Sequence, residues 1–244
     1  MISIIIPTYN EADQISQTIK SILRINKIQA NKGQHAMEII VVDGGSNDQT
    51  ISIAKNCGAI AILSEKKGRA AQMNIGASIA KGEIFYFLHA DSIPPQNLTG
   101  FITDALQNGY SSGCFRLCFD FPHWFLKANC WFTRFDINAF RFGDQSLFVT
   151  RDGFNKCGGY NEDLIIMEDQ EIIHRIKKHG KFKVMNAALT TSARKYRVNG
   201  IFRMQAIFYR IWFLYYLGYP QGHLLKLYQK LIHKNKPDHS SSQL

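Results

Sequence analysis

The stretch Ile2-Ser3-Ile4-Ile5-Ile6-Pro7-Thr8-Tyr9-Asn10-Glu11 sets the pattern for the whole chain. An apolar run of five residues closed by a proline is typical of a central parallel strand, buried on both faces. Acids at Glu11 and Asp13, followed by apolar residues at helical spacing from Ile15 to Leu23, predict a helix directly after it. The first thirty residues therefore predict a strand, a polar loop and a helix.

The same alternation continues to about residue 107. We expect strands over 37–42, 59–63 and 84–88, and helices over 49–56, 69–80 and 96–107. Strands alternating with helices at this spacing predict an α/β fold with a doubly wound, mostly parallel, Rossmann-like sheet. In such a sheet ligands bind at the carboxyl ends of the strands. Three polar clusters fall at such ends: Thr8 to Glu11, Asp43-Gly44-Gly45, and His89-Ala90-Asp91.

The second half is less regular. It is crowded with aromatic residues between Phe115 and Phe142, and we expect a strand over 146–150 and helices over 167–179, 201–217 and 224–232. We interpret residues 1–233 as a single domain, with a regular first half (1–110), a less regular second half (111–200) and C-terminal amphipathic helices (201–233). The segment 234–244, which contains Ser240-Ser241-Ser242, is expected to be disordered.

Charge is distributed unevenly along the 244 residues. Residues 1–174 hold 15 Lys and Arg against 18 Asp and Glu, a net charge of −3, whereas residues 175–244 hold 14 Lys and Arg and only Asp238 as an acid, a net charge of +13. A basic segment appended to a near-neutral domain indicates an anionic surface or substrate rather than nucleic acid. The start lacks a basic, signal-like segment, and the five cysteines are odd in number without a CxxC pair, so we expect a cytoplasmic protein.

Successive motifs resemble those of family 2 glycosyltransferases with the GT-A fold. The resemblance rests on Ser3-Ile-Ile-Ile-Pro-Thr-Tyr-Asn-Glu11, Ile39-Ile-Val-Val-Asp-Gly-Gly-Ser46, His89-Ala-Asp91 and Glu168-Asp169. Gly68-Arg-Ala-Ala-Gln-Met-Asn-Ile-Gly-Ala77, Gly143-Asp-Gln145 and Ser192-Ala-Arg-Lys-Tyr196 resemble a bacterial subfamily associated with radical-SAM or selenium-domain proteins, some members of which are linked to arsenosugar biosynthesis. The resemblance covers roughly residues 1–230 and implies a nucleotide-binding half over 1–110 and an acceptor and catalytic half over 111–200.

The resemblance implies a nucleotide-sugar donor and a divalent cation, Mn²⁺ or Mg²⁺. Asp91 is the expected metal ligand, and His89 stands where the family has the first acid of Asp-x-Asp; imidazole suits Mn²⁺ better than Mg²⁺. Asp43 is expected to accept a hydrogen bond from the base, which favours a UDP-linked donor. Arg69 is expected to supply a cation to the diphosphate, because Met73 stands where many members carry arginine. The remaining expected nucleotide-sugar contacts are Pro7, Thr8, Tyr9, Glu11, Gly44, Gln72, Asn74, Ala90, Asp144, Gln145 and Arg194.

An inverting transferase needs one base near the acceptor hydroxyl and no enzymic nucleophile. Asp169 matches the family's base and lies at the start of a predicted helix, where an ionised carboxylate is favoured. Glu168 is expected to support Asp169 or to bind the acceptor, and Asp144 is the rival base. The predicted reaction is metal-assisted transfer of a sugar to a hydroxyl of a small or lipid-linked acceptor. Two alternatives stay open: a nucleotidyltransferase of related fold, and a non-catalytic, membrane-associated nucleotide-sugar-binding protein.

The predicted helix over 201–217 carries aromatic residues and only two charges, Arg203 and Arg210, seven residues apart and so on one face. About 17 residues with a central arginine make a poor transmembrane helix. The composition suits peripheral binding at the anionic inner face of a membrane, or packing on the core or on a second subunit in a homodimer.

Overall fold

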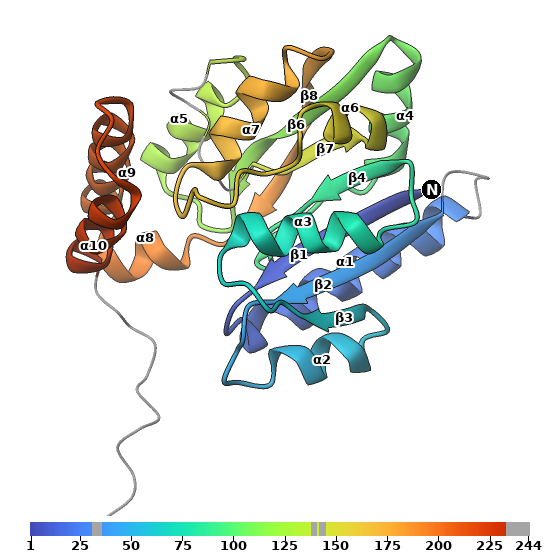
Figure 1. The fold of residues 1–244 in the computed structure, drawn as a ribbon, viewed down its shortest axis with the longest axis horizontal. Helices are drawn as coiled ribbons and strands as arrows, with labels where there is room; N and C mark the ends of the chain where they lie inside the picture. The colour runs from blue at the N-terminus through green and yellow to red at the C-terminus, as the bar shows by residue number, and fades with distance from the viewer. Residues whose placement is uncertain (31–35, 138–140, 142–144, 233–244) are drawn as a thin grey trace, which may run out of the picture. The chain divides into compact units, whose positions relative to one another are not determined.

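A computed structural model describes residues 1–30, 36–137, 141 and 145–232. The chain forms two compact units, one from Met1 to Ser192 and one from Ala193 onward, and each is described by itself (Figure 1). Asp144 and the tail over 234–244 lie outside the described residues, as does the helix end expected at residue 233. The prediction of a single domain over 1–233 stays a prediction.

The first unit alternates strands and helices in its N-terminal half and is richer in long strands afterwards. Its elements are β1 (Ile2–Thr8), α1 (Ala12–Ala30), β2 (Met37–Asp43), α2 (Thr50–Asn56), β3 (Ile60–Leu63), α3 (Arg69–Ile79), β4 (Ile84–Phe87), β5 (Ser92–Ile93), α4 (Leu98–Gln107), β6 (Tyr110–Phe119), α5 (Trp124–Phe132), β7 (Leu147–Thr150), α6 (Arg151–Lys156), α7 (Glu168–Ile176) and β8 (Lys181–Thr191).

One eight-stranded sheet runs in the order β3-β2-β1-β4-β7-β6-β8-β5. The strands β3, β2, β1 and β4 are parallel, with Ile4 opposite Ile39 and Tyr86. Beyond β4 the direction changes: β7 runs antiparallel to β4 and to β6, whereas β6 and β8 are parallel to each other. The predicted α/β class with a mostly parallel sheet is confirmed. Because the first four strands are parallel, their carboxyl ends lie along one edge.

Helices cover both faces of this sheet and make two apolar cores (Figure 1). On one face α1, α2 and α4 pack on inward residues such as Ile4, Val41 and Tyr86. On the other face α3, α6 and α7 pack on the alternate residues, among them Ile5 and Phe87. The division follows from the period of two in a strand, which sends neighbouring side chains to opposite faces.

Helix α3 approaches the sheet closely because Gly76 has no side chain. A Cβ at Gly76 would lie 2.4 Å from Cγ2 of Ile5 and 3.2 Å from Cγ2 of Val42. The N-terminus of α3 is thereby held over the carboxyl ends of β1 and β2.

The second unit contains α8 (Arg194–Asn199), α9 (Ile201–Tyr216) and α10 (Gln221–Leu231). In α9 the buried residues Met204, Ile207 and Ile211 share one face, while Phe202 and Phe213 are exposed. The predicted helices over 201–217 and 224–232 are therefore found, the second starting three residues earlier than expected. Searching the described helices finds none that combines the length and hydropathy needed to cross a bilayer.

The predicted elements do not include β8 or the helix α5. Much of β8 is half-buried and polar, with Lys181, Lys183 and Asn186 among its residues, so it has no continuous apolar run. It is a strand because it pairs in parallel with β6, some seventy positions earlier, and local periodicity does not report such a long-range contact.

Candidate active site

A buried carboxylate organises the loop after β2. Asp43 is fully buried, and its Oδ1 accepts hydrogen bonds from the backbone N–H groups of Gly45 and Ser46 at 2.9 and 2.7 Å. Its Oδ2 accepts from the hydroxyls of Ser46 and Thr8 at 2.6 and 3.0 Å. Both oxygens therefore already hold the loop over 44–46 against the end of β1. The predicted contact of Asp43 with a nucleotide base stays a prediction.

Gln72 of α3 connects the ends of β1 and β2. Its Nε2 donates to the backbone carbonyls of Thr8 and Val42, both at 2.7 Å. A Cβ at Gly44 would lie 3.1 Å from that same Nε2, so a glycine here lets the loop pass close over the amide. Gln72 and Thr8, both predicted to contact nucleotide, are buried, and their side chains donate hydrogen bonds to backbone carbonyls.

Three residues of the first loop differ in exposure. Pro7 is buried, Tyr9 is exposed and Glu11 is half-buried at the start of α1, where its carbonyl accepts hydrogen bonds from the N–H groups of Gln14 and Ile15. Tyr9 and Glu11 are therefore accessible at the edge formed by the strand ends, and the predicted contacts of all three residues with a nucleotide sugar stay predictions.

The loop after β4 presents the predicted metal ligand. His89 and Asp91 are half-exposed, whereas Ala90 between them is buried and its carbonyl accepts a hydrogen bond from the Thr18 hydroxyl at 2.6 Å. The carbonyl of Asp91 accepts from the N–H of Ser192 at 3.2 Å. These backbone bonds fix the loop and leave the side chains of His89 and Asp91 partly accessible.

The acidic pair at the start of α7 lies beside an arginine from α3. Glu168 is 0% exposed, and Nε of Arg69 lies 2.7 Å from its Oε1; Nη2 of Arg69 lies 3.9 Å from Oδ2 of Asp169. Met167, just before the helix, has φ of 70°, a left-handed conformation that costs a non-glycine residue free energy. Arg69, predicted to meet a diphosphate, thus engages the two acids in the described structure.

A second set of contacts ties α3 to the loop before α7. The Asn74 amide donates to the carbonyl of Tyr160 at 2.9 Å and to Glu162 at 3.0 Å, and its Oδ1 accepts from the N–H of Tyr160 at 2.8 Å. Hydrogen bonding from Asn74, followed by that from Lys66, lowers the pKa of Glu162. Asn74, another predicted nucleotide contact, thus holds this loop in place through hydrogen bonds to Tyr160 and Glu162.

A pocket opens to solvent where these parts meet. It is lined by Pro7, Met73, Phe87, Leu88, His89, Gln145, Leu147, Tyr160, Asp169 and Ile173. The fold thereby brings the predicted residues Pro7, Gln145 and Asp169 to one cavity, although they are far apart in the sequence. Burial, followed by the charges of Asp169 and Glu168, raises the pKa of Tyr160 well above its ordinary value.

Sequence reasoning missed Tyr160 and Met73 as pocket residues. Tyr160 follows two glycines with positive φ, Gly158 and Gly159, which turn the chain toward the pocket. The Gly158-Gly159-Tyr160 sequence was the local signal that could have predicted a turn and an aromatic residue at the pocket. Arg194, by contrast, begins α8 of the second unit. Among the described residues no group of three or more His, Cys, Asp or Glu side chains is arranged to hold a metal ion unaided.

Solved structures show what this fold is similar to. A mannosyltransferase from Pyrobaculum calidifontis in complex with GDP-Man and Mn²⁺ matches with a TM-score of 0.66 at 18% identity, covering 86% of this chain and 61% of that chain. Residues 1–349 of TarS from S. aureus in complex with UDP-GlcNAc match with a TM-score of 0.60 at 17% identity, covering 78% of this chain and 58% of that one. At such identities the likeness shows the fold, which is of the GT-A type.

Curated relatives match about two fifths of the chain. The glycosyltransferase AglE of Haloferax volcanii is 33% identical over 101 residues, or 39% of this chain and 32% of AglE. An undecaprenyl-phosphate 4-deoxy-4-formamido-L-arabinose transferase of Pseudomonas fluorescens is 28% identical over 112 residues, or 43% of this chain and 32% of that protein. The matched segment thus spans about a third of these relatives. The family model described as glycosyl transferase family 2 matches residues 3–166, about two thirds of the chain, and includes the ends of β1, β2 and β4. The chain therefore belongs to glycosyl transferase family 2.

Proposed function

We propose that the protein is an inverting glycosyltransferase that moves a sugar from a nucleotide-diphosphate donor to an acceptor hydroxyl, with Asp169 as general base. The observation that carries this is the presence of the Asp169 carboxylate in the same pocket wall as strand-end residues Pro7 and His89. Asp169 takes the hydroxyl proton, the acceptor oxygen bonds to the anomeric carbon from one side, and the bond to the diphosphate oxygen breaks on the other. Glu168 supports Asp169 from a fully buried position.

The donor we propose is a nucleotide sugar, with UDP as the favoured nucleotide. Structural neighbours hold GDP-Man or UDP-GlcNAc, and Tyr9, Glu11 and Gly44 border the strand ends of this chain at which such a donor would lie. A panel of UDP-, GDP- and TDP-sugars, assayed for transfer and for slow donor hydrolysis, tests the assignment. Turnover of a UDP-sugar supports it, and binding of none of the panel by calorimetry contradicts it.

A divalent cation, Mn²⁺ or Mg²⁺, fits the residues that follow β4. Magnesium-type sites in proteins commonly use one or two carboxylates and complete their shell with water and substrate phosphates. Asp91, partly accessible, supplies one carboxylate, and His89 supplies an imidazole nearby. When bound, the ion would stabilise the charge of the leaving diphosphate. Water-proton relaxation with Mn²⁺ and UDP should show a tighter complex for the native chain than for Asp91→Asn, and equal affinities would exclude Asp91 as the ligand.

Single substitutions distinguish the two candidate bases. Asp169→Asn should lower kcat by about a hundredfold to ten-thousandfold, the usual contribution of a positioned base, with donor affinity unchanged. Asp144→Asn should retain most of the activity. Near-native turnover in Asp169→Asn would refute the assignment.

We propose a lipid-linked or small-molecule hydroxyl acceptor and peripheral contact of α9 with an anionic membrane. One of the relatives above is named for an undecaprenyl-phosphate substrate. On α9 the exposed residues Phe202, Tyr209, Phe213 and Tyr216 follow at spacings of seven, four and three and so form one aromatic stripe. The fraction of protein that floats with anionic liposomes should decrease when Phe202 and Phe213 are changed to Ser. No flotation of the native chain would contradict the membrane contact.

A further inference from the structure

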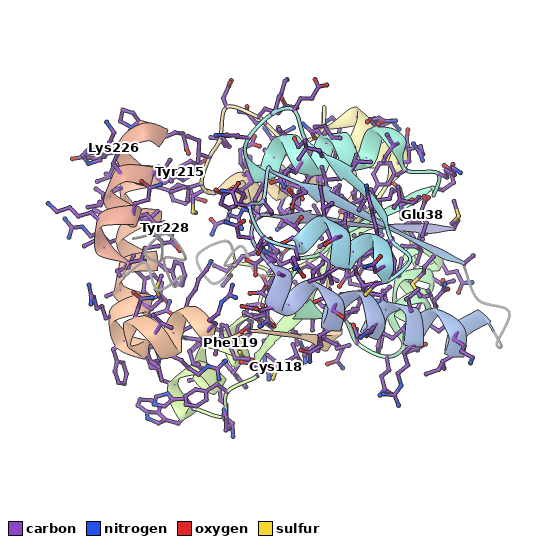
Figure 2. The ribbon with its side chains drawn as sticks, turned by 90° about the horizontal axis from the view of Figure 1, so that it is seen from below. Glu38, Cys118, Phe119, Tyr215, Lys226 and Tyr228 are labelled. Atoms are coloured by element: carbon purple, nitrogen blue, oxygen red, sulfur yellow. The ribbon has the colours of Figure 1, made fainter. Side chains whose placement is uncertain are left out.

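The first unit carries an exposed aromatic face of its own, on helix α5. Trp124 is 67% exposed and Trp131 is 47% exposed, and the spacing of seven residues places them on one side of the helix together with Lys127. The opposite side holds Leu126, which is fully buried. The end of β6, marked by Cys118 and Phe119 in Figure 2, leads into this helix.

The turn after α5 extends the face. The Trp131 ring centroid lies 5.2 Å from that of exposed Phe135, and the guanidinium carbon of Arg134 lies 4.4 Å from the Trp131 centroid. We define the α5 face as Trp124, Lys127, Trp131, Arg134 and Phe135. Single exposed apolar residues are ordinary, but a contiguous aromatic group at the surface marks a binding site.

The α5 face is positively charged. From residue 123 to 135 the sequence has two cations, Lys127 and Arg134, and no acid. Of the flanking acids, Asp136 is engaged by two cations, with Arg141 Nη2 and Lys177 Nζ each 2.5 Å from its Oδ1. Asp120 precedes the helix and is the remaining flanking acid. Tryptophan rings with interspersed cations favour the interface of an anionic bilayer, where indoles lie at headgroup level and cations meet lipid charge.

The second unit presents the same chemistry independently. Its residues 193–232 hold seven Lys and Arg and no acid, and α9 carries the aromatic stripe described above; Lys226 is labelled on α10 in Figure 2. Each unit, taken by itself, combines exposed aromatic residues with cations. This repeated charge pattern favours a bilayer over a single protein partner.

A hydrogen bond links the C-terminal end of α5, next to Arg134 of the α5 face, to the pocket. Gln145, which lines the pocket, donates through Nε2 to the carbonyl of Phe115 at 3.3 Å and more weakly to that of Thr133 at 3.5 Å. Thr133 is the C-cap of α5 and is flanked by the exposed Phe132 and by Arg134. A lipid surface on the α5 face would therefore lie near the pocket that contains Asp169.

We propose that the α5 face docks on an anionic lipid bilayer and so presents the pocket to an acceptor carried in that bilayer. The acceptor part rests on the proposed glycosyl transfer, whereas the docking itself does not. Docking requires neither donor nor metal, so Asp169→Asn should bind vesicles as the native chain does even though its transfer activity is lost.

The test uses the full chain with Trp212→Phe, which leaves Trp124 and Trp131 as the only tryptophans. Vesicles containing phosphatidylglycerol should shift the emission to the blue, and brominated lipid should quench it, whereas pure phosphatidylcholine vesicles should have a much weaker effect. Vesicles that sediment with the protein without changing this emission would overturn the proposal, because contact would then lie elsewhere.

A substitution pair supplies the control. In the native background, changing Trp124 and Trp131 to Ser should weaken sedimentation with anionic vesicles by about tenfold or more. Leu63→Ser removes an equally apolar residue, 60% exposed on β3, and should leave vesicle binding unchanged. If the tryptophan variant instead abolished a dimer seen by analytical ultracentrifugation, with vesicle binding intact, the α5 face would be a contact between two copies and the proposal would be wrong.

Discussion

Replacing Arg69 by Met should destabilise the protein through Glu168. Arg69 supplies the positive charge beside a carboxylate that is fully buried, with 2.7 Å between Nε and Oε1. Breaking a buried ion pair costs about 3–5 kcal/mol, because the remaining charge is left uncompensated. The Arg69 side chain is 39% exposed, so water can reach the vacated space and reduce the loss. We therefore expect a decrease in the free energy of unfolding of about 2–3 kcal/mol.

A double-mutant cycle isolates the interaction. Urea unfolding is measured for the native chain, Arg69→Met, Glu168→Gln and the double variant. Because Glu168→Gln removes the buried charge, it should recover part of the loss, and the double variant should be more stable than the sum of the single effects by about 1 kcal/mol or more. Additive single effects, within about 0.5 kcal/mol, would refute the reasoning.

Lys66 and Glu162 provide a matched comparison at the same distance. Their charged atoms also lie 2.7 Å apart, but the side chains are 70% and 35% exposed. Solvent screens an exposed pair and weakens its contribution, so Lys66→Met should change stability far less than Arg69→Met. Equal losses at the two sites would show that burial is not what makes the Arg69 pair important.

Three further outcomes are expected. Gly76→Ala should lower the free energy of unfolding by about 1–3 kcal/mol, because its Cβ would lie 2.4 Å from Cγ2 of Ile5; an unchanged urea midpoint would show that α3 can move outward without cost. The pKa of Glu162 is lowered, chiefly by the hydrogen bond from the Asn74 amide, so the stabilising contribution of Glu162 is present above the unfolded-state pKa and is lost as the pH falls through the lower folded-state value. The difference in Tm between the native chain and Glu162→Gln should therefore shrink toward acid pH. A difference that grows toward acid pH would contradict this. A disulfide reagent should label Cys118 first, because it is the exposed cysteine among the five, and retention of the fast phase in Cys118→Ser would contradict this.

The parallel half of the fold could be predicted from the sequence because its signals are local. Runs such as Ile4–Ile6 and Ile39–Val42 are continuously apolar, and each leads into a polar loop. The helices between them are given by spacing and by acids such as Glu11 and Asp13 in the first turns. The same local pattern indicated the edge at which Asp43 and Asp91 lie.

Tertiary structure decided what these polar residues do. Asp43, Gln72 and Asn74 are residue types that often bind ligands. In the folded chain their side chains instead form hydrogen bonds with backbone groups that only folding brings near. Arg69 is the clearest case, because its partner Glu168 is about a hundred positions away. No local sequence pattern predicts a contact between residues so far apart in the chain.

The strand–helix order, the family motifs and the strand-end edge can all be predicted without a structure, because periodicity and loop chemistry are properties of neighbouring residues. The structure alone decided the antiparallel placement of β7, the pocket that joins Pro7 to Asp169, and the exposure of Trp124 and Trp131. These features depend on contacts between distant segments, and burial exists only once those segments have packed together.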